Sequence, residues 1–170
     1  MKKILLLLTF AGLLFSSCEK GCDCDDENGF NGKYHIGQLV TCEDGSKGVV
    51  FDVYDGVKLV SVDEITDSFV TFESAKLWCE NLGNGWRLPT IKELEVIFAL
   101  KHYLNATLRD AGYRCFVVVG YPYSGKSYLS STVVNNKYQY FDFCEGDSSP
   151  IGGVGMDFEK QMYVRAVRDL

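Results

Sequence analysis

The chain has 170 residues, a formal net charge of -6 and an aromatic content of 14%. A net negative charge gives no general attraction for nucleic acids or anionic lipids, which argues against both as main binding partners. Only three prolines occur beside many aromatic side chains, and this composition is typical of a packed domain rather than a disordered chain.

The first 17 residues have the pattern of a secretory signal peptide. Lys2 and Lys3 precede an apolar, uncharged run from Ile4 to Phe15. The run is shorter than the ~20 apolar residues that a membrane-spanning helix needs. We therefore expect export from the cytoplasm without a remaining transmembrane helix.

The end of this segment resembles the lipobox of bacterial lipoproteins. The residues are Phe15-Ser16-Ser17-Cys18, and the resemblance implies cleavage before Cys18 and lipidation of its thiol. The following acidic residues are similar to the surface-export signal of Bacteroidota lipoproteins: Glu19, Asp23, Asp25, Asp26 and Glu27. Together they imply a lipid-anchored outer-membrane protein exposed at the cell surface, the alternative being a secreted protein with an acidic linker.

Three segments follow: a signal peptide at 1–17, an acidic flexible tether at 18–33 and one domain at 34–170. The tether contains several glycines and shows neither helical nor strand periodicity. Signal removal takes away two lysines and no acids, so the formal charge moves from -6 to -8. The remaining length suits a single hydrophobic core.

The domain opens with a pattern typical of a three-stranded meander. The apolar, β-branched segments 38–42, 48–54 and 57–62 are separated by Asp-Gly turns. A helix follows, because Phe72, Ala75, Cys79 and Leu82 recur at three- and four-residue spacing before Gly83.

A second helix begins at a capping box formed by Thr90 and Glu93. Its apolar stripe predicts a helix to about Tyr103, with a short extension over 105–111. Strand patterns then return at 115–119, 128–134, 138–144 and 161–168. Helices placed between two sets of strands predict an α+β fold with two helices and mainly antiparallel strands.

One motif resembles a known family. Trp86-Arg87-Leu88-Pro89-Thr90, followed by Glu93, looks like the family named for the C-terminal domain of the collagen-like adhesin Lcl, as do the segments 128–132 and 163–168. The resemblance covers roughly residues 36–170. It implies a C-type-lectin-like fold and an adhesin-like role in binding an extracellular glycan or protein.

The motif also has a structural explanation that needs no ligand. Trp86 and Leu88 would bury apolar area, Pro89 would hold the chain extended, and Thr90 would cap the second helix. The alternative is that Arg87 contacts a ligand. The calcium-binding motifs of sugar-binding C-type lectins are absent from the sequence, so we expect no metal or cofactor.

A second motif matches the phosphate loop of nucleotide-binding proteins. It spans Gly120 to Ser127 and requires a helix that starts at its lysine, whose free amides hold the phosphates. The following residues are rich in β-branched types and favour a strand. Nucleotide binding is therefore the weaker alternative.

The cysteines and histidines carry no recognised catalytic motif, so we expect a protein that is not an enzyme. His35 and His102 have no nucleophile motif beside them. An oxidase of the formylglycine-generating type, which has a related fold, would require Cys115 and Cys144 to act as a reactive pair. Export permits disulfides, with the pairing left open, among Cys22, Cys24, Cys42, Cys79, Cys115 and Cys144.

Tyrosines form the last candidate site. Alternation along a strand places Tyr138 and Tyr140 on the face opposite Phe141 and Phe143. If the phenylalanines are buried, the tyrosines make an outward contact surface; the alternative is that the tyrosines are the buried set. The complete candidate set is Tyr121, Tyr123, Tyr128, Tyr138 and Tyr140.

Overall fold

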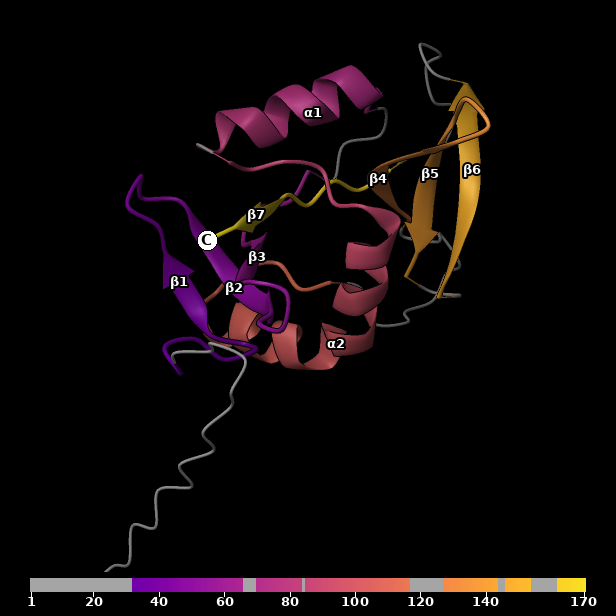
Figure 1. Cartoon of the computed structure of the whole chain (residues 1–170). Coiled ribbons are helices and arrows are strands. Elements are labelled where there is room, and N and C mark those ends of the chain that lie inside the picture. Colours follow the sequence, from indigo (N-terminus) through magenta and orange to yellow (C-terminus); the bar gives the residue numbers. More distant parts are fainter. Residues whose placement is uncertain (1–31, 66–69, 84, 117–126, 144–145, 154–161) are drawn as a thin grey trace, which may run out of the picture.

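The computed structural model describes residues 32–65, 70–83, 85–116, 127–143, 146–153 and 162–170 (Figure 1). These residues form an α+β fold with two helices and two antiparallel sheets, as the sequence predicts. No helix among them has the length and apolar character needed to cross a membrane. The signal peptide, Cys18 and nearly all of the tether lie outside the described residues.

The first sheet contains the predicted meander and the last strand of the domain. Its strands are β1 (Leu39–Thr41), β2 (Lys47–Asp52), β3 (Lys58–Ser61) and β7 (Val167–Asp169), in the order β1-β2-β3-β7. All neighbours are antiparallel, with Val49 opposite Val60 and Val60 opposite Val167. The predicted strand over 161–168 is too long, because Val164 forms only a single bridge with Ile65.

The second sheet is an antiparallel meander of β4 (Ser127–Val134), β5 (Lys137–Asp142) and β6 (Asp147–Gly153). β4 and β5 are joined by Asn135 and Asn136, whose φ angles are 50° and 58°. Two consecutive left-handed residues are typical of a tight hairpin turn, and asparagine tolerates this conformation. The sequence did not predict β6, because Ser, Pro and Gly dominate it and it lacks apolar alternation.

Both helices begin where the sequence predicts. α1 (Phe72–Asn81) is capped by Thr71, whose side chain accepts a hydrogen bond from the Ser74 backbone. α2 (Ile91–Asp110) has the complete capping box of Thr90 and Glu93. α2 is one continuous helix, and the predicted extension over 105–111 forms its last turns as far as Asp110.

Asn105 lies within α2 and makes tertiary contacts to the chain that follows the helix. Its side-chain amide donates to the Phe116 carbonyl at 2.8 Å and accepts from the Phe116 N–H at 2.6 Å. Asn105 is buried within the helix, and these bonds secure the chain that returns after it. Phe116 and Cys115 are not in a strand, and the rest of the strand predicted at 115–119 lies outside the described residues.

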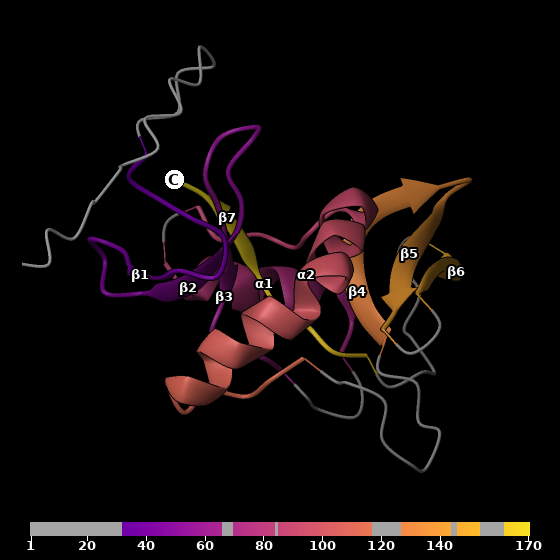
Figure 2. The same ribbon diagram turned by 90° about the horizontal axis from the view of Figure 1, so that it is seen from below.

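The first sheet is buried on both faces, between α1 and α2 (Figures 1 and 2). On β2, Val49 and Phe51 pack with the apolar stripe of α2, whereas Val50 packs with Ala75 and Cys79 of α1. Alternating side chains of one strand thus enter two separate core clusters. Figure 2 shows α2 lying across the first sheet with the second sheet beside it.

A short segment before α2 joins the two sheets. Arg87 pairs with Val167 of β7 through two backbone hydrogen bonds of 2.9 Å, and the Pro89 carbonyl accepts from the Ser131 backbone in β4 at 2.8 Å. Tyr163 makes a second connection to β4 through backbone bonds with Ser127 and Leu129. The Trp-Arg-Leu-Pro motif is therefore the junction between the sheets.

Candidate functional site

The side chain of Arg87 is held by two carboxylates. Its Nη1 and Nη2 donate to the two oxygens of Glu93 at 2.9 and 2.8 Å, and Nη2 also donates to Asp169 Oδ2 at 3.0 Å. This paired geometry is the strong form of an arginine–carboxylate interaction. These bonds raise the pKa of Arg87.

Glu93 accepts hydrogen bonds from both the N-terminus of α2 and the Arg87 side chain. Its Oε2 accepts from the Thr90 backbone N–H at 2.8 Å, which completes the capping box. Burial alone would raise the pKa of Glu93, but hydrogen bonds from Arg87 and Thr90 outweigh it, so the pKa lies below the ordinary 4.5. The predicted cap at Thr90 and Glu93 is confirmed.

Trp86 is packed against the first sheet. Its indole Nε1 donates to Ser46 Oγ at 2.8 Å, and its ring lies so close to Gly48 that a Cβ there would meet it at 2.8 Å. Trp86, Leu88 and Pro89 are all buried. The predicted burial of Trp86 and Leu88 is therefore confirmed.

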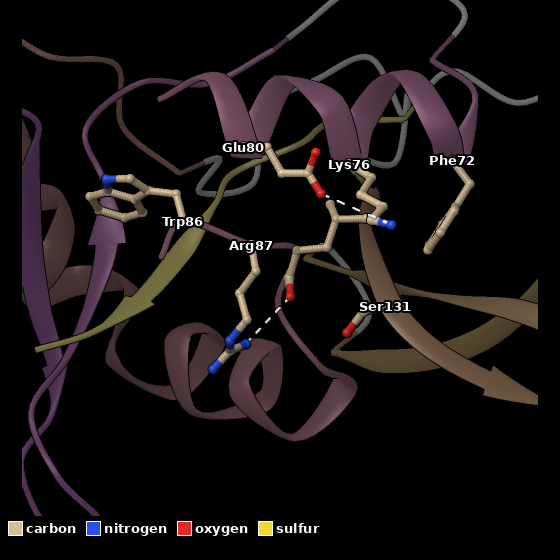
Figure 3. A pocket seen from close by; sticks show the side chains of 7 residues that line it. Phe72, Lys76, Glu80, Trp86, Arg87 and Ser131 are labelled. Atoms are coloured by element: carbon tan, nitrogen blue, oxygen red, sulfur yellow. Dashed lines mark hydrogen bonds and ion pairs between the residues drawn. The ribbon is translucent and has the colours of Figure 1, made fainter. Parts of the chain in front are cut away.

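A groove opens beside this junction, between α1, the motif segment and β4. We call it the α1 groove; it encloses about 250 Å³ and is lined by Phe72, Lys76, Glu80, Trp86, Arg87, Leu88 and Ser131. Figure 3 shows Phe72, Lys76 and Glu80 projecting from α1 on the side where Arg87 and Ser131 lie. The three α1 residues Phe72, Lys76 and Glu80 are four residues apart in sequence and so lie on one face of the helix.

The groove combines an apolar interior with a polar rim. Trp86 and Leu88 are nearly inaccessible and form its floor, while Phe72 is half-buried. Lys76 Nζ lies 4.0 Å from Glu80 Oε1, and these two side chains are 58% and 55% exposed. Binding sites for small ligands typically have an apolar interior and a small number of polar groups that point into it.

The predicted tyrosine surface is wrong for Tyr128 and Tyr138. Tyr128 is 0% exposed and Tyr138 is 5% exposed, and Tyr140 is only partly exposed. Phe141 and Phe143 are buried as expected, but β5 is covered on both faces, so the opposite face is core as well. Tyr121 and Tyr123 lie outside the described residues.

Tyr138 nevertheless supports the groove. Its ring stacks on Phe72 with 3.8 Å between centroids and 14° between planes. The stack fixes the orientation of the aromatic wall that Phe72 contributes. Tyr138 is thus a positioning residue one layer behind the groove.

Tyr128 belongs to a buried charge cluster that the sequence did not reveal. Its hydroxyl donates to Glu64, which lies 3.4 Å from the Arg165 guanidinium. Arg165 is 1% exposed, stacks on Phe116 and donates to the Arg114 carbonyl at 2.7 Å. Burial, and next the charge of Glu64, raise the pKa of Tyr128. Glu64 and Arg165 are far apart in sequence, which is why no local pattern pairs them.

The phosphate-loop hypothesis lacks its required helix. Residues 120–126 lie outside the described residues, but Ser127, the last residue of the motif, begins strand β4. A strand provides no row of free amides at its start of the kind that holds phosphates. The strand predicted from the β-branched residues is confirmed.

The cysteines give no support for catalysis within the described parts of the chain. Cys42, Cys79 and Cys115 are free thiols, and burial raises the pKa of Cys79 to about 12, which makes its thiol unreactive. Cys144, needed for the hypothetical oxidase pair, lies outside the described residues. Among the residues that are described, no three His, Cys, Asp or Glu side chains form a metal-binding group.

The groove residues Phe72, Lys76, Glu80 and Ser131 were missed as a site. Phe72, Lys76 and Glu80 are four residues apart on α1, but only Phe72 belongs to the apolar repeat that predicts this helix, and only the fold brings Ser131 opposite it. No protein-family description matches the chain, and no curated protein is significantly similar to it.

We predict that Tyr128→Phe destabilises the domain by about 1–3 kcal/mol, because Glu64 loses a hydroxyl donor in a buried site. Urea unfolding measures the change. Tyr103→Phe is the control, because Tyr103 is 71% exposed and should change stability by less than ~0.5 kcal/mol. Equal effects of the two substitutions would contradict the role assigned to the Tyr128 hydroxyl.

We predict a pH-dependent loss of stability centred on Glu93. A carboxyl with a lowered folded pKa contributes stability above its unfolded pKa of 4.5, and this contribution is lost as the pH falls through the folded value. Glu93→Gln should lower the free energy of unfolding by about 1–3 kcal/mol at neutral pH. The free energy of unfolding of this variant should then fall less steeply at acid pH than that of the wild type. Unfolding at several pH values measures this, with exposed Glu95→Gln on the same helix as control. If the free energy of unfolding falls as steeply below pH 4.5 in Glu93→Gln as in the wild type, the role assigned to Glu93 is refuted.

Proposed function

We propose that the chain is an exported lipoprotein whose domain binds a ligand outside the cell. In this proposal Cys18 carries the lipid anchor in the outer membrane, residues 18–33 act as a spacer, and residues 34–170 form the binding domain. The sequence supports the anchor through the apolar run from Ile4 to Phe15 and the lipobox-like residues before Cys18.

The C-type-lectin-like architecture is part of this proposal. Its support is the pairing of β3 with β7, which brings the beginning and the end of the domain into one sheet. The Trp-Arg-Leu-Pro segment extends this pairing from β7 toward β4. Two helices and two antiparallel sheets are compatible with the same architecture.

The α1 groove is the observation that carries the binding function. It has a prearranged aromatic wall, a buried apolar floor and exposed charged groups at its rim. Among the residues that the structure describes, its lining contains no cysteine or histidine that could act as nucleophile or general base. These features favour recognition of an extracellular glycan or protein over covalent chemistry.

We predict that radioactive palmitate labels the wild-type protein and that Cys18→Ala abolishes the label. The substituted protein should also leave the outer-membrane fraction, because the acyl chains supply the membrane affinity. Cys22→Ala and Cys24→Ala are matched controls in the same acidic segment and should keep the label. Undiminished labelling of Cys18→Ala would reject the anchor.

We predict that Ser131→Trp blocks the groove. Ser131 is exposed at its edge, so an indole there should occupy the cavity with little cost to the core. Binding of cells displaying the protein is measured on printed arrays of glycans and of extracellular-matrix proteins. Val134→Trp, an exposed position on the same strand outside the groove lining, is the control.

At least a tenfold loss of signal in Ser131→Trp alone would support the groove as the binding site. Equal binding by Ser131→Trp, Val134→Trp and the wild type would contradict it.

A further inference from the structure

The size of the α1 groove limits its occupant to one ring. About 250 Å³ is below the ~300–1,000 Å³ typical of pockets for drug-sized ligands. The ligand portion inside the groove is therefore a single compact group, and the rest of a larger ligand would remain outside.

The aromatic wall favours an occupant with a flat, weakly polar face. Tyr138 covers one face of Phe72, and Phe72 in turn lines the groove. The negative face of an aromatic ring attracts the slightly positive C–H groups on one side of a pyranose sugar. Since the Phe72–Tyr138 stack already fixes the ring, a ligand need not order it on binding.

The rim provides a donor and an acceptor side by side. Lys76 and Glu80 form an exposed pair at the distance limit of an ion pair, so their mutual attraction is weak and easily exchanged. An ammonium only donates and a carboxylate only accepts, whereas each sugar hydroxyl does both. Two neighbouring hydroxyls could therefore bond Lys76 and Glu80 without leaving either charge unpaired.

The charge around the groove disfavours an anionic ligand. Arg87 is neutralised by Glu93 and Asp169, and Lys76 faces Glu80, so the described side chains here comprise two cations and three carboxylates. The chain as a whole is negative at -6. Sulfated or carboxylated sugars would thus be repelled rather than attracted.

We propose that the α1 groove binds one neutral pyranose residue of an extracellular glycan, with its apolar face on Phe72 and neighbouring hydroxyls on Lys76 and Glu80. This inference rests on the proposed binding function and narrows it to one ligand class. Arg87 keeps its carboxylate partners and lines the groove, and its guanidinium nitrogens do not bond the sugar.

Calorimetric titration of the lipidated full chain in detergent micelles tests the inference. The probes are the methyl glycosides of glucose, galactose, mannose and N-acetylglucosamine, compared with sialic acid, glucose 6-sulfate and N-acetylphenylalaninamide. We expect a neutral glycoside to bind, and Lys76→Ala/Glu80→Ala to weaken it at least tenfold, as expected for lost charge-assisted hydrogen bonds. Alanine retains the helix.

Lys92→Ala/Glu95→Ala is the matched control, because it removes an exposed Lys and Glu from α2 outside the groove. Its affinity should equal that of the wild type. Binding of no neutral glycoside would overturn the sugar proposal.

Groove-dependent binding of a charged sugar or of the amide alone would overturn the neutral-sugar proposal and leave the binding function intact. Binding of any probe that neither Lys76→Ala/Glu80→Ala nor Ser131→Trp reduces would remove the groove as the site and contradict both proposals.

Discussion

The contact between Arg87 and Glu93 determines how the parts of the domain are held together. The backbone of Arg87 pairs with β7, while its side chain reaches the first turn of α2 and Asp169 at the end of the sheet. One residue therefore fixes a sheet edge, a helix start and a strand end. Because Glu93 also caps α2, the helix and the sheet cannot shift independently.

The groove is a consequence of this junction. With Arg87 directed to Glu93, its neighbours Trp86 and Leu88 turn into the opposite core cluster beneath α1. α1 then covers the sheet without filling the space next to β4, and its Phe72 is held by Tyr138 from the second sheet. The candidate site thus lies where three elements meet, and none of them contains it alone.

The features of the fold that the sequence predicts correctly are formed by residues close together in the chain. The capping box of α2, the spacing along α1 and the Asp-Gly turns of the first sheet are local, and the structure contains all of them. Burial of Tyr128 and Tyr138 could not be predicted, because strand alternation separates two faces without telling how many are covered. β6 could not be predicted either, because it is a strand through its pairing with β5 and its own residues show no strand pattern.

The pairing of β3 with β7 also governs when the domain can fold. Val60 meets Val167, so the first sheet remains incomplete until almost the last described residues are available. Contacts between such distant segments form slowly because a long loop must close first. A nascent chain without β7 would keep a strand edge of the first sheet unpaired, and for a protein exported as proposed, this delay favours an unfolded chain during passage through the membrane.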